Sequence, residues 1–257
     1  MNIASKTSTG TRARLIVSLL IIDELAYISY GYSTYEYVGD PINILNILSG
    51  FEVDEVLIID LSASRANHLN LNLMRRLRAV SDFPLSYAGG IRTMNDANAI
   101  MQLGFDKLCL NACNPNLSIL LLQISQYYGV QSLAVSVDYT TVCNKRYIYN
   151  PYTRNGTQLG LATAVCALPV NLFSDILFSS VPRAGSQTGI DIDIIYDTTI
   201  QNLRNPIVLS SGLGSNGREL LAQLTELHSG VAGLAASASI FLQSVRFSAL
   251  VCLERHY

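Results

Sequence analysis

An internal repeat constrains the fold of this 257-residue chain more than any other feature of its sequence. Three pairs of similar segments lie at nearly one offset: Pro84–Ile91 with Pro206–Leu213, Gly104–Ala112 with Gly230–Ala238, and Asp54–Asp60 with Ser174–Ser180. A fixed offset indicates that one structural unit recurs, so each half should have the same architecture.

Short apolar runs alternate with amphipathic stretches, which is typical of βα units and a parallel sheet. The predicted strands are Leu15–Ile22, Val56–Leu61, Leu85–Ala88, Leu108–Leu110, Leu133–Val137, Ile176–Ser180, Ile207–Ser210 and Gly233–Ala236. The predicted helices are Asp40–Gly50, Leu69–Val80, Asn95–Leu103, Asn116–Tyr128 and Gly217–Leu227. Four βα units that occur twice predict a single α/β domain, a (β/α)8 barrel over residues 14–257 after a flexible tail at 1–13.

Two segments are less regular. Leu161–Leu172 is a weak helix candidate, because Pro169 would remove a backbone donor and clash with the preceding turn. The excursion Tyr139–Gln158 alternates in polarity and contains Asn155-Gly156, a pair that favours a hairpin turn. We expect this excursion to form a β-hairpin over one mouth of the barrel.

Composition excludes several classes of function. The net charge is −2 and charged residues make up only 14%, so the chain has no basic footprint for nucleic acid or anionic membrane. The uncharged stretch Leu108–Val137 is interrupted by asparagine, glutamine and proline, and no run of ~20 apolar residues exists. The first residues have no apolar core of the secretory kind. We therefore expect a cytoplasmic protein.

The five cysteines and three histidines give no clear metal site. Cys109 and Cys113 lie close in sequence but have no nearby histidine and no second pair, so buried thiols in a reducing compartment are favoured. The histidines lie away from the predicted strand ends, which also excludes a visible Ser-His-Asp arrangement. We expect neither a metal nor a cofactor.

Small residues follow four predicted strands, at the face where such barrels carry their chemistry. They are Gly89 and Gly90, Asn111 and Ala112, Ser211 and Gly212, and Ser237 and Ala238. Backbone N–H groups can approach an anion at such positions. One Gly-Gly pair alone indicates only a turn, but its recurrence in both halves favours a phosphorylated small-molecule substrate.

Asp138 ends the fifth predicted strand, where a carboxylate would face the barrel mouth as a general acid or base. The alternative is a carboxylate that caps the following loop. The repeat offset pairs Asp138 with Leu20, so a symmetric pair of carboxylates is missing. Asp60, at the end of the second strand, is a further candidate or merely orients the neighbouring loops.

Four charged residues stand at or near the beginnings of strands, at the opposite face: Arg14, Glu55, Lys107 and Asp175. Charges that enter a barrel need opposite partners. We predict that these two basic and two acidic side chains form a paired ring at the base of the barrel. The alternative is that they are solvated strand ends.

Several motifs together resemble the cyclase (HisF) subunit of imidazole glycerol phosphate synthase, from about Arg14 to Gln243. They are Tyr37–Asn43, Glu52–Ser64, Ala88–Ile91, Asp106-Lys107 with Asn111, Val135–Asp138 and Arg183–Asp191. The resemblance implies a partner, a HisH-like glutaminase, that releases ammonia beneath the barrel. It assigns the four-residue ring as the ammonia gate, Asp106 as a docking residue and Gly185 as a further phosphate contact.

The chain departs from the family pattern at several sites. Leu20 occupies the position of the first catalytic carboxylate, and Asp175 stands where a glutamate is usual. Ala88, Pro182 and Ala184 replace a glycine and two aspartates. Leu20 and the Tyr37–Asn43 stretch look more like a paralogous branch from surface-polysaccharide pathways, which is thought to form an acetamidino group on a nucleotide sugar.

Three functions follow from these observations. The first is an ammonia-accepting synthase acting on a phosphorylated sugar or nucleotide sugar. The second is the cyclase of histidine biosynthesis, which Leu20 disfavours because leucine cannot exchange a proton. The third is a barrel without catalysis that docks and activates a glutaminase.

Overall fold

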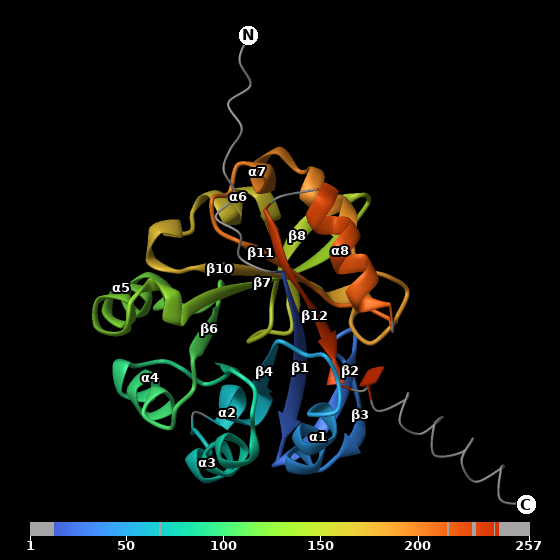
Figure 1. Cartoon of the computed structure of the whole chain (residues 1–257). Helices are drawn as coiled ribbons and strands as arrows, with labels where there is room; N and C mark the ends of the chain where they lie inside the picture. Colours follow the sequence, from blue (N-terminus) through green and yellow to red (C-terminus); the bar gives the residue numbers. More distant parts are fainter. Residues whose placement is uncertain (1–12, 67, 215, 228–229, 239, 242–257) are drawn as a thin grey trace, which may run out of the picture.

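Eight parallel strands close into a barrel in the computed structural model, which describes residues 13–66, 68–214, 216–227, 230–238 and 240–241. The strands are β1 (Arg14–Ile22), β4 (Glu55–Asp60), β5 (Leu85–Ala88), β6 (Lys107–Asn111), β7 (Leu133–Val142), β10 (Asp175–Ser180), β11 (Ile207–Ser210) and β12 (Val231–Ser237). The β6–β7 pairing joins the two halves on one side and the β12–β1 pairing joins them on the other, and β7 also pairs with β10, so the ring of strands is closed (Figure 1). The predicted (β/α)8 barrel is confirmed.

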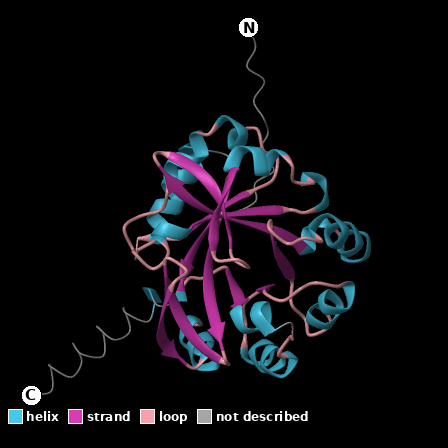
Figure 2. Ribbon diagram, turned by 180° about the vertical axis from the view of Figure 1, so that it is seen from behind, coloured by secondary structure: helices cyan, strands magenta, loops and turns pink. Residues whose placement is uncertain are grey.

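Helices surround these strands on the outside (Figure 2). They are α1 (Pro41–Leu48), α2 (Leu61–Ala66), α3 (Leu71–Val80), α4 (Met94–Met101), α5 (Leu117–Tyr128), α6 (Leu161–Cys166), α7 (Thr198–Gln201) and α8 (Gly217–Leu227). Local sequence fixes several of their starts. The Asp40 side chain accepts from two backbone N–H groups at the start of α1, and Thr93 and Asp96 form a capping box on α4.

The predicted helix Leu161–Leu172 is too long. Helix α6 ends at Cys166, and Val170–Leu172 forms only a 3₁₀ turn. Pro169 lies between the two, where it cannot donate a backbone hydrogen bond, so the helix does not continue. Further 3₁₀ turns cover Val130–Ser132, Val181–Arg183 and Ile192–Tyr196.

A β-hairpin follows the first and the fifth barrel strand. Strands β2 (Leu25–Tyr30) and β3 (Thr34–Gly39) extend from β1, and strands β8 (Lys145–Asn150) and β9 (Asn155–Gly160) extend from β7. The second hairpin was predicted, but its turn lies at 151–154 and Asn155-Gly156 begins β9 instead. The first hairpin was missed. The repeat therefore includes a hairpin in each half.

The core has two parts. The larger part fills the space between the strands and the helices and includes Leu48, Met74, Tyr87 and Phe178. A smaller apolar layer lies inside the barrel and consists of Ile16, Leu57, Cys109, Ala134, Leu177, Val208 and Ala235. The barrel interior is thus packed at mid-height, as expected for this fold.

One glycine in each half, Gly89 and Gly212, holds the loop after β5 or β11. A Cβ atom on Gly89 would lie 2.3 Å from the Asp60 carbonyl oxygen, and one on Gly212 would lie 2.3 Å from the Gly189 carbonyl oxygen. Both glycines have positive φ, at 134° and 88°. Close approach to a neighbouring loop therefore requires glycine in both halves.

We predict that Gly212→Ala lowers the free energy of unfolding by about 3 kcal/mol, because it adds a steric clash to the strain of a positive φ. Gly189→Ala is the matched control, since Gly189 has φ 101° but a Cβ atom added there would meet no atom within 4 Å. This control should lose only ~1 kcal/mol from backbone strain. Urea unfolding measures both, and equal losses would contradict the role of the close approach.

Candidate active site at the carboxyl end of the barrel

A cavity of about 480 Å³ opens at the carboxyl ends of the barrel strands. All eight barrel strands contribute lining residues, and so do both hairpins. Its floor is the apolar layer inside the barrel, since Leu57, Cys109 and Leu177 belong to both. This is the end of a (β/α)8 barrel where ligands bind.

Most residues predicted for the site line this cavity: Gly89, Gly90, Asn111, Asp138, Gly185, Ser211, Gly212 and Ser237. Two others lie outside its lining. Ala112 donates its N–H to the Ser136 carbonyl oxygen at 2.8 Å, and the Ala238 side chain is buried in the core. Ala112 therefore has no free N–H for an anion, so its predicted phosphate contact does not fit this structure.

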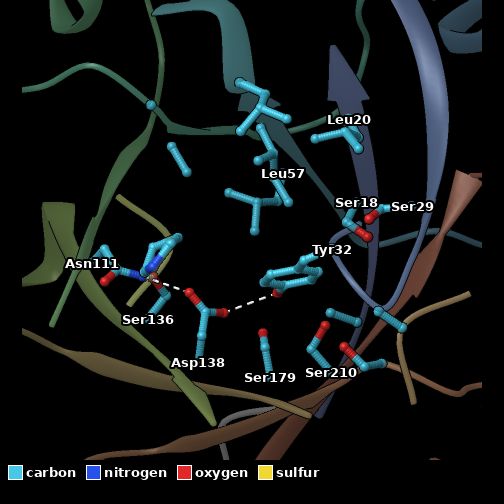
Figure 3. Close-up of a pocket in the computed structure, with 18 of the residues that line it drawn as sticks. Ser18, Leu20, Ser29, Tyr32, Leu57, Asn111, Ser136, Asp138, Ser179 and Ser210 are labelled. Carbon is cyan, nitrogen blue, oxygen red and sulfur yellow. Dashed lines mark hydrogen bonds between the residues drawn. The ribbon is translucent and has the colours of Figure 1, made fainter. Parts of the chain in front are cut away.

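Asp138 is the carboxylate inside the cavity. The Tyr32 hydroxyl donates to its Oδ1 at 2.9 Å, and the Asn111 amide donates to its Oδ2 at 2.6 Å (Figure 3). Burial raises the pKa of Asp138 to about 6, against the hydrogen bonds from Tyr32, Asn111 and Ser179, which lower it. Its partners are cavity side chains rather than loop N–H groups, so the geometry favours an acid–base group over a loop cap.

Asn111 differs from its predicted role. Its amide nitrogen holds Asp138, and its Oδ1 accepts from the Cys113 N–H at 2.9 Å. Both ends of this side chain are therefore engaged within the protein. Asn111 orients the carboxylate in this structure.

Asp60 belongs to the scaffold. Its Oδ1 accepts from the Ala63 N–H at 2.8 Å, which caps α2, and its Oδ2 accepts from the Tyr87 hydroxyl at 3.4 Å. Burial raises the pKa of Asp60, but the residue does not belong to the cavity lining. The interpretation that Asp60 orients neighbouring loops fits this geometry.

Two groups of cavity residues were not predicted from the sequence. One group is Ser18, Ser136, Ser179 and Ser210, which form an arc of hydroxyls on five neighbouring strands together with the predicted Ser237. The other group is aromatic and comes from the hairpins: Tyr27, Tyr32, Tyr35, Tyr149 and Tyr152. The serines could have been found from the alternation of inward-facing positions along each strand. Tyr27, Tyr32 and Tyr35 could not be found without the missed hairpin, whereas Tyr149 and Tyr152 belong to the hairpin that was predicted.

Arg65 and Arg154 bring positive charge to the cavity lining. The Arg65 guanidinium lies 5.5 Å from the centre of the Tyr35 ring and donates to its hydroxyl at 3.3 Å. Stacking of this kind holds an arginine while leaving other N–H groups available. The cavity therefore combines a hydroxyl-rich wall, one carboxylate and two cations.

The predicted ring forms at the opposite end of the barrel. Arg14 pairs with Glu55 at 2.7 Å and with Asp175 at 2.8 Å, and Lys107 also pairs with Asp175. Burial alone would raise the pKa of Asp175, but Lys107 and Arg14 outweigh it and lower that pKa. The predicted pairing is confirmed. Nearby, Asp106 is exposed and its side chain accepts from the Leu85 N–H at 2.9 Å.

Some chemistries have no visible site in the described part of the chain. Burial raises the pKa of Cys109 to about 12 and that of Cys113 to about 11, so neither is a ready thiolate. Among the described residues, no three potential metal ligands gather. None of the described helices is long and apolar enough to cross a membrane.

The fold and the site define a class: a (β/α)8 barrel with a polar ligand cavity at its carboxyl end. Residues 28–245 match the model of a family described as "Histidine biosynthesis protein". The chain belongs to this family.

Relatives in this family are named as HisF proteins. A Leptospira borgpetersenii protein named "Putative imidazole glycerol phosphate synthase subunit HisF" is 28% identical over 249 residues, which covers 93% of this chain and 94% of that protein. A Pseudomonas aeruginosa protein named "Putative imidazole glycerol phosphate synthase subunit hisF2" is 30% identical over 213 residues, which covers 79% of this chain and 82% of that protein. The protein named "Imidazole glycerol phosphate synthase subunit HisF" of Sulfurisphaera tokodaii is 26% identical over 180 residues, which covers 68% of this chain and 71% of that protein.

We predict that Asp175→Asn lowers the free energy of unfolding at pH 7 by about 2–3 kcal/mol, because it leaves Arg14 and Lys107 without their shared carboxylate. The folded-state pKa of Asp175 is depressed, so its stabilisation is present above the unfolded-state value and is lost as the pH falls through the folded pKa. The difference between variant and wild type should therefore shrink in acid. Urea unfolding from pH 7 to pH 3 checks this, with exposed Asp82→Asn as the control.

Proposed function

We propose that this chain is the ammonia-accepting synthase subunit of a glutamine amidotransferase pair, adding nitrogen to a phosphorylated sugar or nucleotide sugar. The observation that carries this proposal is the arrangement of the barrel. A paired ionic ring lies at its base, an apolar layer fills its middle and a cavity with one acid–base carboxylate lies at its mouth.

The base of the barrel suits the entry of ammonia from a HisH-like glutaminase. Arg14, Glu55, Lys107 and Asp175 would form the gate, because opening it needs only that side chains exchange partners. The layer beyond consists of packed apolar side chains, so ammonia that crosses it as the neutral molecule would meet little competing water. Asp106 is exposed at the same end and would contact the partner.

The cavity suits an acceptor that has both hydroxyl and phosphate groups. Serine hydroxyls both donate and accept, so the arc of five serines fits a polyhydroxylated ring. Gly89, Gly90 and Gly212, with Arg65 and Arg154, are the groups we propose for phosphate. The buried Ser29 Oγ has no partner within the described chain and belongs to a residue of the cavity lining, which also suits a hydroxylated ligand.

Asp138 would act as the general base. Above pH 6 its carboxylate is ionised and can accept the proton that ammonia loses as its nitrogen bonds to an electrophilic acceptor carbon, while one electron pair of that carbon's double bond to oxygen moves onto the oxygen. Leu20, across the cavity, contributes only apolar surface (Figure 3). We place this activity in the cytoplasm, which suits the free thiols of the described cysteines.

The cyclase reaction of histidine biosynthesis is the second candidate. The names of relatives such as the Sulfurisphaera tokodaii protein favour it. Leu20 disfavours it, because the resemblance places a catalytic carboxylate there and a leucine cannot transfer a proton.

We predict that Asp138→Asn lowers ammonia-dependent product formation by about 10²–10⁴-fold, because it removes the proton acceptor but keeps the shape. The wild-type rate should rise through pH 6 and then level off as Asp138 ionises. The assay pairs the chain with the glutaminase of a neighbouring gene and supplies sugar-phosphate and nucleotide-sugar acceptors. Asp23→Asn is the control, since Asp23 is exposed and outside the cavity lining.

Normal turnover by Asp138→Asn would contradict the catalytic assignment. A wild type that turns over no acceptor yet stimulates its glutaminase would favour a docking barrel instead.

We also predict that the wild type shows no phosphoribosyl cyclisation at the rate of an ordinary cyclase, because of Leu20. Leu20→Asp tests how much of a cyclase site remains, since it restores the missing carboxylate. Gain of cyclisation in this variant would identify an altered cyclase. Cyclisation by the wild type at an ordinary rate would support the histidine pathway and contradict our proposal.

A further inference from the structure

The β2–β3 hairpin brings a tyrosine to the acid–base carboxylate from a distant part of the chain. Tyr32 lies at the hairpin tip with φ 59°, and its hydroxyl donates to Asp138, 106 residues further along. The close-up shows the ring pointing into the cavity toward the carboxylate (Figure 3). The repeat does not predict this contact, because Tyr32 lies in the turn between β2 and β3 and not on a barrel strand.

Three contacts hold the hairpin tip in place. The Gly31 N–H donates to the Ala184 carbonyl oxygen at 3.2 Å, which ties the tip to the loop after β10. The Tyr35 hydroxyl donates to the Tyr32 carbonyl oxygen at 3.1 Å. The Tyr149 ring, from the other hairpin, packs edge-on against Tyr32 with centroids 5.7 Å apart. Two of these contacts hold the backbone of the tip, and the third holds the Tyr32 ring.

Gly185 lies directly against this hairpin. A Cβ atom there would fall 2.6 Å from the Ser29 carbonyl oxygen and 2.7 Å from the Tyr30 ring. The position therefore needs glycine for the hairpin to dock. This gives Gly185 a structural role beside the phosphate contact expected from the resemblance.

We propose that Tyr32 is a positioning residue for Asp138, through which the first half of the barrel contributes to proton transfer although Leu20 stands at its position equivalent to Asp138. The inference rests on the proposed role of Asp138 and deepens it. Tyr32 and Asn111 each hold one carboxylate oxygen, so the group cannot rotate. A carboxylate can accept about four hydrogen bonds, so the donors Tyr32, Asn111 and Ser179 leave one acceptor position for the substrate.

The hydrogen bond also favours the charged form of Asp138. Burial raises its pKa, and donation from Tyr32 is the first of the interactions that oppose this rise. Tyr32→Phe keeps the ring and its contact with Tyr149 but removes this donor. The Asp138 titration midpoint should then rise by about one pH unit, because a hydrogen bond to a charged group is worth that much.

The test is a carbon-13 NMR titration of the Asp138 carboxyl group, assigned by comparison with Asp138→Asn. Tyr30→Phe is the matched control, since Tyr30 is in the same hairpin and donates to a different carboxylate, that of Glu36, at 2.9 Å. The midpoint should move in Tyr32→Phe and stay in Tyr30→Phe. An unmoved midpoint in Tyr32→Phe overturns the proposal.

A second variant and a second measurement make the test independent of one mutant's folding and of the proposed reaction. Gly185→Ala keeps the hydroxyl but displaces the hairpin, so it should raise the midpoint in the same direction. In the ammonia-dependent assay, Tyr32→Phe should lose about fivefold in rate at pH 6 and little above pH 8. A uniform loss at every pH would overturn the positioning role, whereas a shifted midpoint without any turnover would overturn only the proposed function.

Discussion

The closure of the parallel sheet is the constraint on which the rest of this structure depends. Because β10 pairs with β7 and β12 pairs with β1, the carboxyl ends of all eight strands meet around one cavity. The same closure gathers the four charged strand beginnings into one ring at the other end. Residues far apart in sequence become neighbours at each end, and the apolar layer between them keeps the two environments separate.

The fold and part of the site could be predicted from sequence because their signals are local. Apolar strand runs repeat at one offset, Arg14 begins β1, and Asp138 directly follows the apolar run of β7, so the barrel fixes the direction of both side chains. The contact between Tyr32 and Asp138 could not be predicted, since it depends on how a hairpin folds over the mouth. Ala112 was predicted as a phosphate contact because the repeat pairs it with Ala238. Its N–H does not fit this role, since it donates to the Ser136 carbonyl oxygen of the neighbouring strand.

Buried carboxylates have different partners and opposite pKa shifts at the two ends of the barrel. At the base, each carboxylate faces a cation, and the pKa of Asp175 is lowered. In the cavity, Asp138 meets only neutral donors, and burial raises its pKa to about 6. The first arrangement keeps charges fixed at any moderate pH, whereas the second leaves a proton easy to exchange near neutrality. The ion pairs at the base therefore suit a structural closure of the barrel, and a carboxylate that contacts only neutral donors suits acid–base chemistry.

The duplication is therefore symmetric in its scaffold and asymmetric in its chemistry. Each half supplies four strands and a hairpin, but the equivalent positions Leu20 and Asp138 differ completely in their capacity to transfer a proton. A leucine in the first half removes like-charge repulsion from the cavity, so the remaining carboxylate ionises more readily than it would beside a second one. Once one carboxylate works alone, the other half can contribute neutral donors that orient it, and Tyr32 on the first hairpin is such a donor.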